Sequence, residues 1–155
     1  MRLKGKSIII TGGGSGIGLA CTKLFSNEGA QITIFGRRQD RLNATVKEFG
    51  SHVLAVAGDL MIDSDLDNLV SKTLNAFGKI DIVVNNGGIF TGSPIHETND
   101  KDWDPIMNTN IRSAFQLTKR VLPHMIERKA GVFIHISSIA GLIANPGVAA
   151  YNVSK

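Results

Sequence analysis

Tyr151 and Lys155 are the two side chains whose types and spacing best suit acid–base chemistry. Residues four apart on a helix share a face, with Cβ atoms about 5–6 Å apart. A free tyrosine loses its proton only near pH ~10 and is a weak base at neutral pH. An ammonium about 6 Å away would favour the phenolate by roughly 2–3 kcal/mol at an effective dielectric constant of about 20. The pair predicts proton exchange with an alcohol or a carbonyl, unless it is a surface tyrosine beside a solvated lysine.

A glycine-rich turn follows the apolar run 7–10 and reads Thr11-Gly12-Gly13-Gly14-Ser15-Gly16-Ile17-Gly18. Glycines let the backbone turn tightly and approach a pyrophosphate at the positive end of the next helix. The spacing G-x-G-x-x-G does not fit, because Ile17 stands where its last glycine would be. No Gly-Lys-Ser/Thr is present, which disfavours a P-loop. The turn predicts a dinucleotide site, although such a segment can also be only a turn.

Arginines follow the second apolar run, where the sequence reads Phe35-Gly36-Arg37-Arg38. A site for NAD usually carries an acid at this point to hold the ribose 2′-hydroxyl. A carboxylate would repel a 2′-phosphate, whereas guanidinium groups bind it through charge-assisted hydrogen bonds. Unless Arg37 and Arg38 are only solvated charges at the start of a helix, they predict that NADP(H) is preferred over NAD(H).

Five short apolar runs alternate with amphipathic stretches and must position these residues. Runs that are apolar almost throughout are typical of strands covered on both faces. Strands that alternate with helices favour right-handed crossovers. We therefore expect an α/β fold, a Rossmann-type doubly wound parallel sheet with helices on both faces. The predicted strands span 7–10, 32–35, 53–56, 80–84 and 132–136, and the predicted helices 17–27, 40–49, 64–77 and 102–128.

A glycine follows each predicted helix, as a left-handed C-terminal cap requires. These glycines are Gly29, Gly50, Gly78 and Gly131. The stretch 102–128 is either one long helix or two. Pro105 belongs in a first turn, and Pro123 would kink or end a helix interior. Either interpretation leaves Asn110 near the middle of the stretch.

These features together resemble the short-chain dehydrogenase/reductase family, whose turn reads T-G-x-x-x-G-x-G. Four more segments match in order, namely Asp59-Leu60, Asn85-Asn86-Gly87-Gly88, Ser137-Ser138 and Tyr151-x-x-x-Lys155. The resemblance runs from about Lys6 to Lys155 and extends to 3-oxoacyl-carrier-protein reductases. The family usually has alanine where Gly87 stands, so we expect a looser turn there with no loss of cofactor space.

The resemblance also implies roles for individual residues. Ser138 would hydrogen-bond the substrate oxygen while Ser137 faces away. Asn110 would hold a water that links Lys155 to solvent, a role compatible with a buried amide that satisfies backbone groups. Asp59 would touch the adenine. The implied catalytic residues are Asn110, Ser138, Tyr151 and Lys155, and the implied cofactor-binding residues are Gly12, Gly14, Ser15, Gly16, Ile17, Gly18, Arg37, Arg38, Asp59, Leu60, Asn86, Gly87, Tyr151 and Lys155.

Composition disfavours several other classes of protein. Hydrophobic residues make up 43% of the chain and charged residues 19%, as in globular proteins. The net charge of +4 is scattered, so no nucleic-acid partner is expected. No run of ~18 apolar residues predicts a membrane span, and no histidine spacing predicts a metal site. The single cysteine, Cys21, fits a reducing, cytoplasmic compartment. His135 lies among apolar neighbours and is predicted to be a hydrogen-bonded core residue.

The number of strands bears on domain organisation. A doubly wound dinucleotide fold has about six strands and five are visible, so residues 1–155 are expected to form one NAD(P)-binding domain, incomplete at its C-terminus. The fifth strand would then be an exposed apolar edge. Two functions stay open. One is an oxidoreductase that transfers hydride between NADP(H) and a small-molecule alcohol or ketone, as a dimer or tetramer when full length. The other is a truncated module that binds NADP(H) without turnover.

Overall fold

A computed structural model describes all 155 residues and contains one five-stranded sheet with the order β3-β2-β1-β4-β5. Every neighbouring pair of strands is parallel. This order is that of the doubly wound dinucleotide-binding fold, so the predicted fold class is confirmed. Each predicted strand is present, with ends shifted by at most two residues. The strands are β1 (Ser7–Thr11), β2 (Gln31–Gly36), β3 (Val53–Ala57), β4 (Ile82–Asn85) and β5 (Val132–His135).

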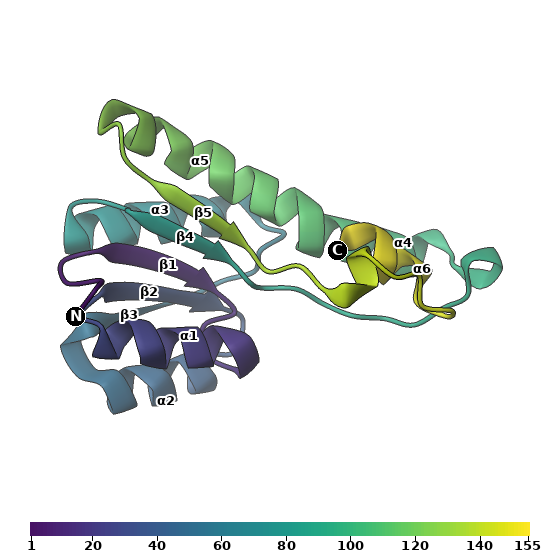
Figure 1. Ribbon diagram of the computed structural model, residues 1–155, viewed down its shortest axis with the longest axis horizontal. Coiled ribbons are helices and arrows are strands. Elements are labelled where there is room, and N and C mark those ends of the chain that lie inside the picture. The colour runs from purple at the N-terminus through teal and green to yellow at the C-terminus, as the bar shows by residue number, and fades with distance from the viewer.

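Helices cover both faces of the sheet (Figure 1). Ile8 and Ile10 of β1 pack in the cluster that includes side chains of α1 (Gly16–Asn27) and α2 (Gln39–Phe49). Ile9 points to the other face and packs with α3 (Asp63–Phe77) and α5 (Ser113–Glu127). All three isoleucines are fully buried. The central strands are apolar throughout because both of their faces lie against helices.

Three of the four predicted glycine caps have a positive φ, although the ψ of Gly50, −147°, lies outside the left-handed helical conformation. Gly29, Gly50 and Gly78 have φ values of 83°, 68° and 73°. The prediction for Gly131 is wrong, because Lys129, with φ of 52°, adopts the left-handed conformation after α5. Gly131 is instead a site of close approach, since a Cβ there would collide with the side chain of Met125.

The stretch predicted at 102–128 forms two α-helices joined by a π-helical turn. α4 (Asp100–Met107) begins after Asn99, whose side chain accepts a hydrogen bond from the backbone N–H of Asp102 at 3.2 Å. The π turn covers Asn108–Arg112 and leads directly into α5. Pro105 is the sixth residue of α4 rather than part of its first turn, and α5 continues past Pro123, so neither a first-turn Pro105 nor a helix end at Pro123 is found. The irregularity falls at Asn110, and π turns often mark functional sites.

β5 is an edge strand with exposed apolar side chains, as predicted. It pairs only with β4, and Val132 and Ile134 are 51% and 37% exposed. His135 is also exposed, so its assignment to the core is wrong. Because β5 has a partner strand on one side only, its side chains can be exposed even where the neighbouring residues in the sequence are apolar. His135 Nδ1 lies 3.4 Å from Nδ2 of Asn85.

One short α-helix and three 3-10 helices complete the structure. The short helix α6 (Ala149–Ser154) packs against α4, away from the strands (Figure 1). Three short 3-10 helices are η1 (Gly50–His52), η2 (Ile95–Glu97) and η4 (Ile139–Gly141). No helix is both long enough and apolar enough to cross a membrane. No group of three His, Cys, Asp or Glu side chains is placed to hold a metal ion.

Candidate active site

The candidate site lies where the chain leaves β1 and β4, the two strands at which the strand order reverses. Thr11, at the end of β1, accepts hydrogen bonds on its Oγ1 from the N–H groups of Asn86 (3.0 Å) and Gly87 (2.8 Å). The Asn86 side chain donates to the carbonyl oxygen of Thr11 at 2.8 Å. These bonds fix the glycine-rich turn after β1 to the turn after β4. Ligands bind at such a switch point in open α/β sheets.

The glycine-rich turn has the backbone that a phosphate cradle needs. Gly12 and Gly16 have φ values of 69° and 52°, which favour glycine. No other side chain or backbone lies within 4 Å of the Cβ position of Gly16, so the turn is open there. Gly18 is tightly packed instead, because a Cβ there would collide with the carbonyl oxygen of Gly12. The backbone can therefore approach a ligand at the N-terminus of α1.

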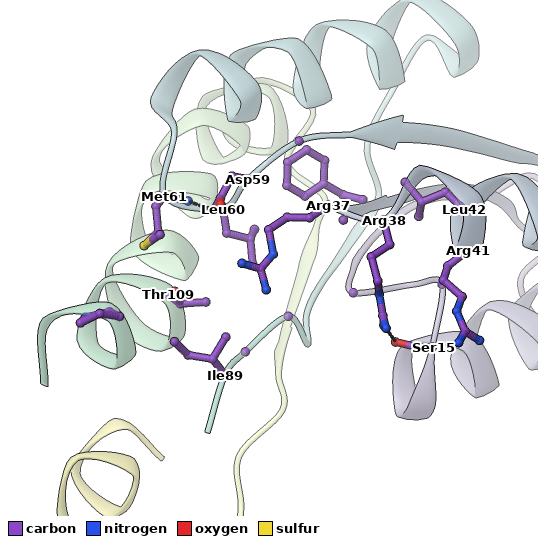
Figure 2. A pocket seen from close by; sticks show the side chains of 18 residues that line it. Ser15, Arg37, Arg38, Arg41, Leu42, Asp59, Leu60, Met61, Ile89 and Thr109 are labelled. Carbon is purple, nitrogen blue, oxygen red and sulfur yellow. Dashed lines mark hydrogen bonds between the residues drawn. The ribbon is translucent and has the colours of Figure 1, made fainter. Parts of the chain in front are cut away.

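A cavity of about 470 Å³ opens between this turn, the end of β2 and the segment after β3 (Figure 2). It is large enough for part of a dinucleotide. Of the predicted cofactor-binding residues, eight line it: Gly12, Gly14, Ser15, Arg37, Arg38, Asp59, Leu60 and Gly87. Six do not: Gly16, Ile17, Gly18, Asn86, Tyr151 and Lys155. The side chain of Asn86 holds the turn together, and Gly18 lets α1 pack against it.

Three arginines lie at this cavity, and all three are exposed. Arg38 donates from Nη2 to the hydroxyl oxygen of Ser15 at 3.1 Å. Figure 2 shows Arg38 and Arg41 extending toward Ser15, and Arg37 toward Leu60. None of the three forms an ion pair with a carboxylate. The cavity therefore carries a surplus of positive charge, three guanidinium groups against the one carboxylate of Asp59, which suits a phosphate dianion.

Arg41 was missed as a site residue. The signal was its spacing, since it follows Arg38 by three residues at the start of α2, and residues three apart on a helix are neighbours.

Asp59 is held in place by its own neighbours. Its backbone N–H donates to Oδ2 of Asp65 at 2.8 Å, and its Oδ1 accepts from the N–H of Met61 at 2.9 Å. Asp65 was also missed, because no motif includes a residue of α3. The Asp59 side chain lies at the edge of the cavity, where it can accept a hydrogen bond from a ligand.

Gly87 does not leave a loose turn, contrary to expectation. A Cβ at this position would lie 2.6 Å from Cδ1 of Leu60 and 3.2 Å from Oγ1 of Thr11. The side chain of Leu60 thus occupies the space that an alanine methyl would take. An alanine here would require Leu60 to move.

A second cavity of about 400 Å³ shares Gly87 with the first and contains Asn110, Ser154 and Lys155. Lys155 Nζ donates to the carbonyl oxygen of Ile136 at 3.0 Å and lies 5.7 Å from the ring centroid of Tyr151. The predicted neighbours Tyr151 and Lys155 are therefore close together, with Lys155 at the second cavity and Tyr151 lining neither cavity.

Both ends of the Asn110 amide are hydrogen-bonded to protein groups. Its Oδ1 accepts from the N–H of Ile89 at 2.8 Å. Its Nδ2 donates to the carbonyl oxygen of Ile89 at 3.0 Å and to Oγ of Ser154 at 2.9 Å. The side chain thus satisfies backbone groups and ties the turn after β4 to α6. The proposed water link to Lys155 stays a prediction.

The two serines after β5 differ from expectation. Ser137 was expected to face away, yet it lines the second cavity and donates to the backbone oxygen of Lys155 at 2.7 Å. Ser138 lines neither cavity, and its Oγ accepts from the N–H of Ala140 at 3.2 Å at the start of η4. Because Oγ of Ser138 acts only as an acceptor there, its own hydrogen is free to donate.

Phe90 was missed by the sequence reasoning. Its ring packs against Tyr151 with centroids 4.9 Å apart and planes at 79°, an edge-to-face arrangement. The motifs specify the residues on either side of this loop but not an aromatic residue within it.

The fold and the site together define a dinucleotide-binding domain of the Rossmann type, with a lysine in the neighbouring cavity and a tyrosine beside that lysine. Residues 6–155 match the family model described as short chain dehydrogenase. The chain belongs to the short-chain dehydrogenase/reductase family.

Individual relatives agree with this assignment. The chain is 36% identical to the 3-oxoacyl-acyl-carrier-protein reductase FabG of Thermotoga maritima, over all of this chain and 64% of the relative. A crystal structure of a short chain dehydrogenase from Bacillus anthracis matches 97% of the chain and 64% of that protein, with a TM-score of 0.92 and 27% identity. The closed form of a serine dehydrogenase complexed with NADP⁺ matches 96% of the chain and 60% of that protein, with a TM-score of 0.91 and 31% identity. The chain therefore spans less than two thirds of the length of these relatives.

Proposed function

We propose that this chain forms the cofactor-binding and proton-transferring part of an oxidoreductase that moves hydride between NADP(H) and a secondary alcohol or carbonyl compound. The observation that carries the proposal is the cavity with three arginines that form no ion pair, which shares Gly87 with the cavity lined by Lys155. The NADP⁺ complex of a serine dehydrogenase with a similar fold supports it.

The residues present fit a bound dinucleotide. The open turn at Gly12 and Gly16 and the N-terminus of α1 would hold the pyrophosphate, because free N–H groups and the helix dipole favour an anion there. Arg38, positioned by Ser15, would bind the 2′-phosphate together with Arg37. When bound, the nicotinamide supplies or accepts the hydride.

The acid–base step would fall to Tyr151. In the reductive direction its hydroxyl gives a proton to the carbonyl oxygen, and in the oxidative direction it takes the proton from the alcohol. The Lys155 ammonium, 5.7 Å from the ring, stabilises the phenolate that forms when the proton leaves. Ser138 would donate its free hydroxyl hydrogen to the same substrate oxygen. Asn110 would hold α6 and the turn after β4 in a fixed position relative to each other.

The cofactor choice is tested by titrating NADPH and NADH against the wild type and Arg37→Ala. NADPH is expected to bind more tightly by about 1.5–3 kcal/mol, the value of a charge-assisted contact. Arg37→Ala should reduce this difference, while Arg2→Ala, a matched control at the exposed N-terminus, should not. Equal affinities of the wild type for both cofactors would sink the NADP(H) assignment.

The catalytic assignment is tested by NADPH oxidation with a panel of ketones. Tyr151→Phe should abolish turnover and leave NADPH affinity nearly unchanged, because the hydroxyl acts on the substrate rather than on the cofactor. Near wild-type activity in Tyr151→Phe would show that another group moves the proton. Tight NADPH binding with no turnover by the wild type would favour the second candidate, a cofactor-binding module, which the partial coverage of the relatives keeps open.

The same proposal includes a cytoplasmic homo-oligomer, a dimer or a tetramer. The support on this chain is a row of apolar side chains on α5 that remain exposed, Phe115 at 62% and Ile126 at 65%. Light scattering coupled to size exclusion measures the mass in solution, and a monomer at all concentrations would overturn this part.

A further inference from the structure

Phe90 contacts the proposed proton donor, although its own environment gives little reason for an aromatic residue. It is 61% exposed, so its burial in the fold is slight. Its ring centroid lies 4.9 Å from that of Tyr151, with the planes at 79°. Edge-to-face pairs of this kind have a preferred geometry and therefore restrict the orientation of both rings.

The loop that carries Phe90 is fixed at both ends. On one side, Asn110 binds both the N–H and the carbonyl oxygen of Ile89, at 2.8 and 3.0 Å. On the other side, Ser93 pairs with Val148, and the N–H of Ala149 donates to the carbonyl oxygen of Ser93 at 3.4 Å. Phe90 is thus held between the π turn and the first residues of α6, the helix that carries Tyr151.

A second group restricts the same ring. Lys155 Nζ lies 5.7 Å from the Tyr151 centroid and is itself held by the carbonyl oxygen of Ile136. An ammonium within about 6 Å of an aromatic ring is attracted to its face. A proton donor must keep its oxygen within hydrogen-bond reach of the substrate, so rotation of the Tyr151 side chain would stop the reaction.

We propose that Phe90 is a positioning residue for Tyr151, holding the phenol ring in the orientation from which it exchanges a proton with the substrate. The inference rests on the proposed function for its kinetic consequence. The orientation itself does not depend on turnover.

The orientation is tested by NMR, because Tyr151 is the single tyrosine among the 155 residues. Selective ¹³C labelling of tyrosine gives one set of ring signals for these residues, assigned by its loss in Tyr151→Phe. Phe90→Leu keeps an apolar side chain but removes the ring, so the Tyr151 ring signals should shift. Ile95→Ala, at another exposed apolar residue (67%) in the same region, is the matched control and should leave them unchanged. Unshifted signals in Phe90→Leu would overturn the proposal.

The kinetic arm separates positioning from general stability. Phe90→Leu should lower kcat about twofold to about tenfold, the equivalent of one lost aromatic pair, while the Kd for NADPH stays unchanged. Phe90→Tyr should restore kcat, because it restores a ring. A parallel loss of NADPH affinity and of the unfolding midpoint would mean a merely structural role and would overturn the proposal. If the wild type turns over no carbonyl compound, the proposed function fails, and the ring signals alone decide whether Phe90 orients Tyr151.

Discussion

Replacement of Asp81 by asparagine should destabilise the fold in a way that depends on pH. Asp81 lies just before β4, at the end of the strand opposite the candidate site, and is 6% exposed. Its carboxylate accepts from Arg128 Nη2 (2.7 Å), the N–H of Ser7 (2.9 Å) and Lys79 Nζ (3.0 Å). Burial alone would raise the pKa of Asp81, but these three donors outweigh it and lower the pKa from 3.8 to about 2.

The pKa of Asp81 sets the size and the sign of the effect. A fall from 3.8 to about 2 corresponds to about 2.4 kcal/mol in the free energy of unfolding, at about 1.36 kcal/mol for each pH unit. Because the folded pKa lies below the unfolded one, this contribution is fully present well above pH 3.8. It is lost as the pH falls from about 5 to about 2.

Urea unfolding followed by the fluorescence of Trp103, the only tryptophan in the chain, measures this contribution between pH 7 and pH 2. Asp81→Asn should be less stable than the wild type by about 2–3 kcal/mol at pH 7, and the difference should narrow below pH 4. Glu97→Gln is the control, because this carboxylate is 65% exposed and its salt bridge is to His96. A difference between Asp81→Asn and the wild type that stays constant from pH 7 to pH 2 would refute the electrostatic reasoning.

Two further substitutions test how the cofactor turn is held. Gly18→Ala should lower both the unfolding midpoint and the affinity for NADPH, because the methyl group would collide with the Gly12 carbonyl oxygen. Scanning calorimetry measures the midpoint and titration calorimetry measures the affinity. Unchanged values of both would contradict the packing argument. Thr11→Val should reduce the free energy of unfolding by about 1–3 kcal/mol, since it leaves the N–H groups of Asn86 and Gly87 without their acceptor. Thr11→Ser keeps the hydroxyl and should recover most of that stability in urea unfolding; if serine is no better than valine, the hydroxyl is not the cause.

The strands and their order were predictable because local pattern and global fold agree in the centre of the sheet. A run such as Ile8-Ile9-Ile10 can be buried on both faces only between helices, and the structure buries it in that way. At the edge the same reasoning fails. His135 lies in an equally apolar run, but β5 has one partner strand, and exposure depends on that partner rather than on the run. Helix ends show a similar limit, since Lys129 took the left-handed conformation in place of Gly131.

The candidate site was predictable where a backbone requirement specifies the residue. Gly12 and Gly16 need positive φ, and the turn they form was found from sequence. Arg41, Asp65 and Phe90 were missed because they act from outside the motifs, through helix spacing, a backbone hydrogen bond and a ring contact. Arginine, aspartate and phenylalanine occur at many positions on protein surfaces. Only the contacts in the folded structure show that these three lie at the candidate site.

Two small residues after β4 bring the glycine-rich turn close to Asn110 and Lys155. A Cβ on Gly88 would lie 3.0 Å from Oδ1 of Asn110 and 3.7 Å from Nζ of Lys155, so the backbone there approaches both groups closely. One residue earlier, the N–H of Gly87 is bonded to Thr11 at the end of β1. Gly87 and Gly88 thus let the turn after β4 contact the glycine-rich turn on one side and Asn110 and Lys155 on the other. A larger side chain at Gly88 would therefore have to displace Asn110 or Lys155.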